Sequence, residues 1–446
     1  MSRPSSTLEA LSLSENTDVC LWCPTPGDED LLVAGTYQLL PESGTRIGSL
    51  HAWRFSRKSE RGAEGLAGAP SDASRRSGAA EAPRGHLEPL PSLSLPCGVF
   101  EACWAPPGSS RASHLAAALT DGTVRVYGVP GTRGPVRRAE GEADAWKELY
   151  ASTPLGSDAS VLACCVDWCR HDPDRLVAST SEGGLAVLRF AEGGASKKEG
   201  PAPSLSGASP SSFSHALSVV CSTRCAHSLE AWAASCGFSA HDLWSGGDDV
   251  ALFRWDDRAG LDAPVARNSR VFSAGVTCIA PHPVVEHLLA VGSYDERVRI
   301  FDARSLRTPL AEGWADGGGV WRARWKAGAA ASGDASAREA AGGMASADAS
   351  RETWWLALAC MQAGQAIAGV EVAWEGSEGR GEGAGARRDV SVGDLAYYPR
   401  QKSLAYGIDW KRETRAEIAE GRRVGLRGSV LASCSFYDNS LDVWEL

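Results

Sequence analysis

Leu243-Trp-Ser-Gly-Gly-Asp-Asp-Val-Ala-Leu-Phe-Arg-Trp-Asp-Asp-Arg258 recurs in altered form as Leu289-Ala-Val-Gly-Ser-Tyr-Asp-Glu-Arg-Val-Arg-Ile-Phe-Asp-Ala-Arg304, at a constant offset of 46 positions. In each copy an apolar run reaches a pair of small residues, turns at an acidic residue and resumes as an alternating strand. This is the pattern of two strands joined by a tight turn. A repeat with a period of this length indicates a fold built from similar units.

Each copy closes on an aromatic residue followed by Asp, which resembles the WD40 repeat, whose blades are four-stranded antiparallel sheets around a central channel. Weaker copies keep an acidic turn residue six positions before an aromatic or aliphatic residue: Asp121 and Tyr127, Glu182 and Leu188, Asp438 and Trp444. Tryptophans that recur near the end of the preceding strand are most simply core: Trp22, Trp104, Trp168, Trp325 and Trp410. We therefore predict an all-β, seven-bladed WD40 β-propeller that forms a single domain.

The acidic turn residues and the recurring tryptophans together delimit the predicted blades and the insertions between them. The blades lie near residues 18–55, 97–129, 161–190, 227–258, 275–304, 319–373 and 403–446. The last blade stops at a third strand, so we expect residues 6–14 to supply its outer strand and leave no open edge. Five insertions are too poor in apolar residues to be buried, and we expect disordered loops there. They are 56–91, 130–145, 192–214, 326–352 and 374–388.

Composition and charge indicate the compartment and the class of partner that we expect for this chain. It is 43% hydrophobic and 22% charged, with a formal net charge of -10, and no apolar stretch is long enough to span a bilayer. The first residues carry no apolar signal-peptide core, so we expect a cytoplasmic, monomeric protein that does not bind membranes. The acidic balance argues against nucleic acid as a partner and favours a basic protein.

The cysteines do not form a metal-binding pattern. There are thirteen, many at strand positions, which buried free thiols in a reducing compartment explain. Cys20-Leu-Trp-Cys23 has metal-like spacing, but no second pair of ligands follows it at zinc-ribbon spacing. We predict no metal site.

The amino-acid sequences of the later repeats show a more specific resemblance. The segments concerned include His227-Ser-Leu-Glu-Ala-Trp232, Ser245-Gly-Gly-Asp-Asp249, Gly292-Ser-Tyr-Asp-Glu296, Gly318-Gly-Val-Trp-Arg322, Tyr406-Gly-Ile-Asp-Trp410 and Cys434-Ser-Phe-Tyr-Asp438. Together, in this order, they resemble the diphthine methylesterase family. The resemblance is close from about 227 to 446, outside the insertions, and thinner across blades two and three.

The resemblance implies a cofactor-free enzyme of diphthamide biosynthesis. Such an enzyme hydrolyses the methyl ester of diphthine on translation elongation factor 2 and releases methanol. Family names sometimes say methyltransferase, but the chain has no strand, Gly-rich loop and helix unit to bind S-adenosylmethionine. The alternative is a non-catalytic WD40 adaptor that presents a rim to protein partners.

The expected binding residues lie on the rim of the propeller face that carries the turns after the second strands, which we call the upper rim. Tyr37, Asp248, Tyr294 and Tyr437 precede turn residues, and Trp232 and Trp321 each follow the start of an inner strand. Diphthine, as the resemblance implies, carries a trimethylammonium group, and such cations bind to aromatic faces beside an acid. The same aromatic residues are equally consistent with an ordinary protein-contact surface.

Catalytic candidates must come from the same rim, because the chain has no Gly-x-Ser-x-Gly motif. Glu230 and Asp248 are our candidates for the base that activates water, with solvated rim carboxylates as the alternative. His227 is either a second catalytic base or, as in WD40 repeats, the structural partner of Asp249. Arg322 either steadies an oxyanion or pairs with a neighbouring acid.

Overall fold

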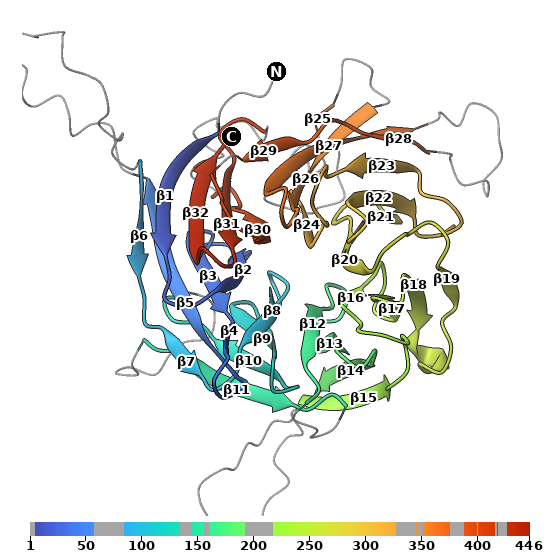
Figure 1. Cartoon of the computed structure of the whole chain (residues 1–446), viewed down its shortest axis with the longest axis horizontal. Helices are drawn as coiled ribbons and strands as arrows, with labels where there is room; N and C mark the ends of the chain where they lie inside the picture. Colours follow the sequence, from blue (N-terminus) through green and yellow to red (C-terminus); the bar gives the residue numbers. More distant parts are fainter. Residues whose placement is uncertain are drawn as a thin grey trace, which may run out of the picture.

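The computed structural model folds the chain into seven antiparallel sheets arranged in a ring, as Figure 1 shows. It describes residues 5–57, 84–133, 144–155, 160–191, 217–326, 344–345, 351–374, 388–398, 400–414, 417 and 426–446. The prediction of an all-β, seven-bladed propeller is confirmed. Within these residues, no helix is long and apolar enough to cross a membrane.

Each blade presents one strand to the central channel and places the others progressively outward. The innermost strands are β2 (Thr17–Trp22), β8 (Val99–Trp104), β12 (Ala163–Trp168), β16 (Ala233–Cys236), β20 (Val276–Pro281), β24 (Arg322–Trp325) and β30 (Ala405–Trp410). The second strands are β3 (Leu31–Thr36), β9 (His114–Leu119), β13 (Arg175–Thr180), β17 (Asp242–Gly246), β21 (Leu288–Ser293), β26 (Arg351–Ala359) and β31 (Val430–Ser435).

The third strands and the outer strands complete the sheets. The third strands are β5 (Thr45–Arg57), β10 (Val124–Gly128), β14 (Leu185–Phe190), β18 (Leu252–Asp256), β22 (Arg297–Asp302), β27 (Gln365–Trp374) and β32 (Ser440–Glu445). The outer strands are β6 (Gly85–Pro89), β7 (Leu93–Leu95), β11 (Lys147–Ser152), β15 (Leu217–Thr223), β19 (Ala266–Asn268), β23 (Ala311–Trp314), β28 (Arg388–Val392), β29 (Ala396–Tyr398) and β1 (Ser6–Ser12). Short additions are β4 (Gln38–Leu40), β25 (Met344–Ala345) and the 3-10 helix η2 (Asp257–Ala259).

The N-terminal segment closes the ring, as the sequence predicts. β1 pairs antiparallel with β32, from Ser6 opposite Glu445 to Ser12 opposite Ser440. In Figure 1 the blue strand β1 lies beside the red strand β32. The last blade is therefore built from both ends of the chain, and its outer edge is covered.

Parts of the predicted insertions are ordered strands, which corrects the expectation of disordered loops there. β6 lies within 56–91, while β25 and the start of β26 lie within 326–352. β6 is held because Leu87 is buried in a cluster with Leu8 and Phe55. Residues 192–214 and most of the other insertions lie outside the described residues.

The core lies between neighbouring blades. Trp22, Trp168, Trp325 and Trp410 are buried as predicted, whereas Trp104 is half-buried against the cluster of the first two blades. The indole N–H groups of Trp325 and Trp410 donate to backbone carbonyls of a neighbouring blade, Ala280 and Arg324. These tryptophans therefore link consecutive blades at the lower end of the inner strands.

Candidate active site at the upper mouth of the channel

We call the face that carries the loops entering each blade, and the turns after the second strands, the upper face. Most inner strands begin there with a β-bulge, which inserts one extra residue opposite the second strand. The extra residues are Asp18, Phe100, Cys164, Thr277 and Tyr406.

Trp232 and Trp321 occupy the equivalent position in blades four and six. The N–H groups of the preceding residues, Ala231 and Val320, donate to the end of the previous blade's second strand, as that of Ala405 does in blade seven. Every blade thus contributes one residue to what we call the bulge ring. Its members are Asp18, Phe100, Cys164, Trp232, Thr277, Trp321 and Tyr406.

Three members of the bulge ring meet across the channel. The ring centroids of Phe100 and Trp232 are 6.0 Å apart with nearly parallel planes. Trp321 lies 6.3 Å from Phe100 and 5.9 Å from Trp232. These three residues, which we call the aromatic triangle, come from blades two, four and six. At such separations the rings are in contact, so they cover this part of the channel.

Further aromatic residues extend the triangle into one cluster. Tyr294 lies 5.9 Å and Tyr406 5.2 Å from Trp321, measured between ring centroids. Phe436 continues the chain of contacts from Tyr406 at 4.9 Å to Tyr37 at 5.9 Å. Tyr437 contacts Phe436 at the edge of the cluster and is 70% exposed. The structure therefore brings together all five aromatic residues that the sequence nominated for binding.

Sequence reasoning missed three members of this cluster. Phe100 and Tyr406 were overlooked although they hold the same strand position as Trp232 and Trp321. Aligning that position in all seven repeats would have found both. Phe436 gave no signal, because it precedes a rim residue and is itself buried.

The two candidate bases lie together beside the cluster. The indole N–H of Trp232 donates to Asp248 Oδ1 at 3.3 Å. The backbone N–H of Asp248 donates to the carbonyl of Glu230 at 2.8 Å, which joins the two segments that carry these acids. Burial raises the pKa of the Tyr294 phenol, and Tyr406 and Asp248 add to the effect, so this neighbour stays protonated.

His227 does not face the aromatic cluster with a free nitrogen. Its Nδ1 lies 2.8 Å from Asp249 Oδ1 and its Nε2 lies 2.8 Å from Ser245 Oγ. Trp255 donates to the same hydroxyl at 2.9 Å, and the His227 side chain is 0% exposed. Although burial opposes it, the His227 contact holds the pKa of Asp249 below its usual value. This geometry corresponds to the structural alternative for His227.

Arg322 lies in a buried network instead of at the surface. Its Nε donates to Glu101 Oε2 at 3.0 Å, and it also lies 3.4 Å from Asp18 Oδ1. Its remaining hydrogen bonds go to backbone carbonyls of other blades: Asp18 at 2.8 Å, Tyr406 at 2.7 Å and Phe100 at 2.9 Å. Of the two alternatives for this residue, the geometry corresponds to pairing with acids.

Asp18 is a titratable group that the sequence reasoning did not single out. Burial raises its pKa to about 7, against the opposing effect of Arg322. The sequence signal was its place in the bulge ring, where it is the one carboxylate. A carboxyl group that titrates near neutrality is suited to proton transfer, but it also marks buried structural networks.

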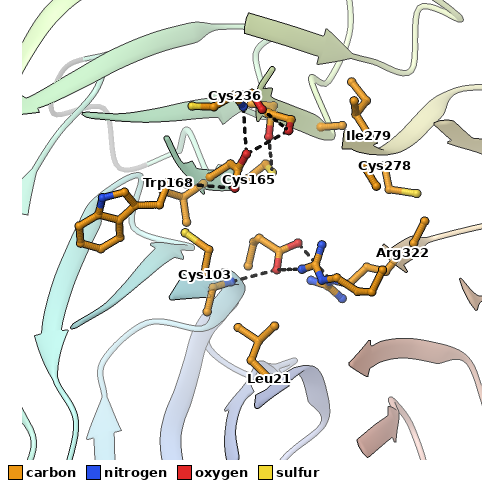
Figure 2. A pocket seen from close by; sticks show the side chains of 18 of the residues that line it. Leu21, Cys103, Cys165, Trp168, Cys236, Cys278, Ile279 and Arg322 are labelled. Carbon is orange, nitrogen blue, oxygen red and sulfur yellow. Dashed lines mark hydrogen bonds and ion pairs between the residues drawn. The ribbon is translucent and has the colours of Figure 1, made fainter. Parts of the chain in front are cut away.

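A cavity of about 360 Å³ extends below the aromatic triangle along the inner strands of blades two to six. Figure 2 shows Arg322 reaching into it opposite the strands that carry Cys103 and Cys165. Cys278 also lines this space, and burial raises the pKa of Cys165 to about 12 and that of Cys278 to about 11. These thiols are therefore protonated and weakly nucleophilic.

Cys20 and Cys23 point away from each other. A separation of three residues places two side chains on opposite faces of a strand. Cys20 packs in the cluster with Trp22 and Ala432, whereas Cys23 packs with Leu31 and Val33. In the described part of the chain, no group of three or more His, Cys, Asp or Glu side chains could hold a metal ion.

Comparison with known proteins finds relatives that share one name. The chain is 30% identical over 336 residues to "Diphthine methyltransferase" of Mus musculus and 26% over 333 residues to "Diphthine methyltransferase homolog" of Dictyostelium discoideum. It is 25% identical over 345 residues to "Diphthine methyltransferase" of Homo sapiens. The matches cover 71%, 72% and 71% of this chain, and 58%, 72% and 63% of the respective relatives. No protein-family model matches.

A solved structure supports the fold. The chain matches one in "Crystal Structure of Mitotic Checkpoint Complex" with a TM-score of 0.54 and 14% identity, over 99% of this chain and 92% of that one. At that level of identity the similarity concerns the propeller alone.

Proposed function

We propose, because the chain belongs to the family of proteins named diphthine methyltransferase, that it is an enzyme of diphthamide biosynthesis. Its reaction is hydrolysis of the methyl ester of diphthine on translation elongation factor 2. The observation that carries the proposal is the aromatic cluster at the upper mouth, with Asp248 bonded to Trp232.

The aromatic cluster suits a quaternary ammonium group. A trimethylammonium ion cannot donate a hydrogen bond, so it is recognised by aromatic faces and by a nearby negative charge. Trp232, Trp321 and Tyr294 supply the faces, and Asp248 supplies the charge. The trimethylammonium group of diphthine would place the adjacent ester carbon within a few ångströms of the same carboxylate.

Ester hydrolysis at this position needs one base. Asp248 or Glu230 takes a proton from water, and the water oxygen bonds to the ester carbon. The tetrahedral intermediate then breaks its bond to the methoxy oxygen, which receives the proton and leaves as methanol. The products are methanol, the carboxylate of diphthine and one proton that the new acid group releases to solvent, so atoms and charge balance without an oxidant or a cofactor.

The fold favours hydrolysis over methyl transfer. Doubly wound domains that bind S-adenosylmethionine or dinucleotides need parallel strands joined by helices and a Gly-rich loop. Among the strands that the structure describes, every pairing is antiparallel. This arrangement supports acid–base chemistry on a bound ester as the proposed reaction.

The upper face also suits a protein substrate. Large apolar side chains are exposed on this face, some at its turns and others on outer strands: Leu39, Leu40, Leu229, Trp314, Tyr397 and Tyr437. Exposed aromatic and aliphatic residues of this kind are typical of protein-binding surfaces. The same rim is what a non-catalytic adaptor would use, and this observation keeps the adaptor as the second candidate.

One incubation separates the two candidates. The purified chain is mixed with elongation factor 2 that carries methylated diphthine, and the modified peptide is weighed by mass spectrometry. We expect loss of the ester methyl group and release of methanol. A stable complex with an unchanged peptide mass would favour the adaptor. A parallel sample with the unmethylated acid and S-adenosylmethionine should show no gain of a methyl group, and a gain would overturn the hydrolase.

A further inference from the structure

The cavity below the aromatic triangle runs the whole length of the inner strands. In blade two its lining follows the chain without a break from Phe100 to Pro107, which is from the bulge ring to the loop below the strand. In blade six it extends from Trp321 to Trp325. The cavity therefore joins the underside of the candidate active site to the opposite face of the propeller.

The two ends of this cavity differ. At its upper end Trp321 is 7% exposed and its ring contacts those of Phe100 and Trp232. At its lower end Pro107 is exposed, while Pro24 and Pro283 are half-buried. The space is thus covered by aromatic rings above and reaches the surface below.

The lining combines small side chains with both apolar and polar groups. Small side chains stand at its middle, including Cys165, Ser235 and Cys278. Charged groups also face it, and Arg324 keeps 31% of its side chain exposed. The polar groups of this mixed lining, around a space of about 360 Å³, favour ordered water molecules, because buried charges that lack full protein partners retain hydration.

We propose that this cavity is the conduit for the small hydroxylic molecules of the reaction, so that water enters and methanol leaves through the lower mouth. The inference rests on the proposed function, in which a protein substrate covers the upper mouth. A covered mouth cannot exchange water and methanol with solvent from above. The lower mouth is the free route in this geometry.

Substrate binding itself opens the upper end of the conduit. The three rings of the aromatic triangle are already in contact, so a trimethylammonium group can enter between them only if they separate. That separation exposes the ester to the polar space beneath. The reacting water then comes from the cavity and the methanol returns to it.

The channel thiols provide a direct test of access from below. Cys103 lies in the middle of the lining, and Cys164 lies in the bulge ring at the upper end. A small methanethiosulfonate reagent is applied at alkaline pH, with and without elongation factor 2 bearing methylated diphthine, and labelled peptides are quantified by mass spectrometry. Cys164 is 2% exposed and lines the same cavity, so reagent should reach both thiols through the lower mouth. We expect the bound elongation factor to leave the labelling rates of both within about twofold, and protection of both thiols by it would overturn the conduit.

A plug in the lower half gives the kinetic test. Ala280 lines the cavity near its lower end, and Ala280→Phe narrows it. We expect kcat for methanol release to fall about tenfold or more while KM stays nearly constant. Ser218→Phe adds the same bulk on the exposed outer strand β15 and should leave kcat unchanged. An unchanged kcat in a folded Ala280→Phe protein contradicts the proposal.

A second variant blocks the lower mouth after folding, so its result does not depend on whether the Ala280→Phe protein folds. Pro107→Cys, at an exposed turn, is conjugated to a bulky maleimide after folding, which covers the lower mouth from outside. Slower methanol release and slower Cys103 labelling are expected together, and persistence of both rates refutes the conduit. If the unmodified protein releases no methanol at all, the esterase fails, and the labelling rates still decide whether the cavity opens below.

Discussion

Arg322→Met should destabilise the propeller much more than any ordinary surface change. The guanidinium carries the hydrogen bonds of four blades: it belongs to blade six and contacts Asp18 in blade one, Glu101 and Phe100 in blade two and Tyr406 in blade seven. Its side chain is 4% exposed, and those of its acidic partners are 3% and 14% exposed. Methionine keeps most of the volume and removes every donor.

The expected cost follows from what remains after the substitution. Removing one partner of a buried ion pair typically costs about 3–5 kcal/mol, because the other charge stays buried without compensation. Three backbone carbonyls also lose their donor, at roughly 1–3 kcal/mol for each group left unsatisfied, although such terms do not add fully. Asp18 can relieve part of the cost by binding a proton, since its pKa is already about 7. We expect a net loss of about 4 kcal/mol in the free energy of unfolding.

Urea denaturation followed by tryptophan fluorescence measures this loss. Arg324→Met is the matched control, because Arg324 is two residues along the same strand but is 31% exposed and reaches Glu101 at 3.6 Å. It should cost at most about 1 kcal/mol. Adding Glu101→Gln to Arg322→Met should recover part of the stability. A loss below about 1 kcal/mol for Arg322→Met, combined with loss of activity, would refute the structural role and restore the oxyanion role.

Three further predictions concern the candidate site. Replacing both Glu230 and Asp248 with Ala should abolish methanol release while circular dichroism and the melting temperature stay nearly unchanged; if activity survives, the base lies elsewhere. Trp232→Ala should raise KM about tenfold or more, and Trp232→Phe, which keeps an aromatic face, should raise it less; equal effects would exclude a cation–π contact. The pKa of Asp18 is raised to about 7, so the unfolded chain loses this proton first and stability falls as pH rises from about 4 to 7. The slope is at most roughly 1.4 kcal/mol in the free energy of unfolding per pH unit, and Asp18→Asn should remove it. Urea unfolding at several pH values measures this free energy for both proteins. If the pKa of Asp18 is not raised, the two proteins will show the same dependence on pH.

The parts of the fold that the sequence predicts are those with a local signal. An acidic turn residue, an alternating strand and a closing aromatic residue lie within a dozen positions, so the 46-residue offset between Asp249 and Asp295 can be read directly. Apart from the strand predicted at residues 6–14, the outer strands were missed because one of their faces meets solvent and their apolar pattern is weak. In β15, for example, Val219 and Val220 are exposed at 40% and 53%.

Only part of the candidate site could be predicted, because residues from different blades come together only when the seven blades close into a ring. Phe100 and Trp321 are 221 positions apart and touch only when blades two and six face each other across the channel. Rim residues such as Tyr37 and Tyr294 could be placed from the turn beside them. No local pattern distinguishes an arginine that points to solvent from one, like Arg322, that crosses the channel to three other blades.

The adjacent residues Trp321 and Arg322 serve two different requirements. The aromatic rings at the mouth must be able to move, and the inner strands below them must stay in place. If a cation enters the aromatic triangle, its rings must separate, and a propeller whose inner strands separated with them would lose its core. Arg322 holds the inner strands of blades six, seven, one and two together immediately below the rings, through bonds to Glu101 and to the backbone of Asp18, Phe100 and Tyr406. These bonds fix strands and leave the ring of Phe100 free to turn on its own side-chain torsions. We infer that the buried network allows the mouth to open by side-chain rotation alone, without movement of the blades.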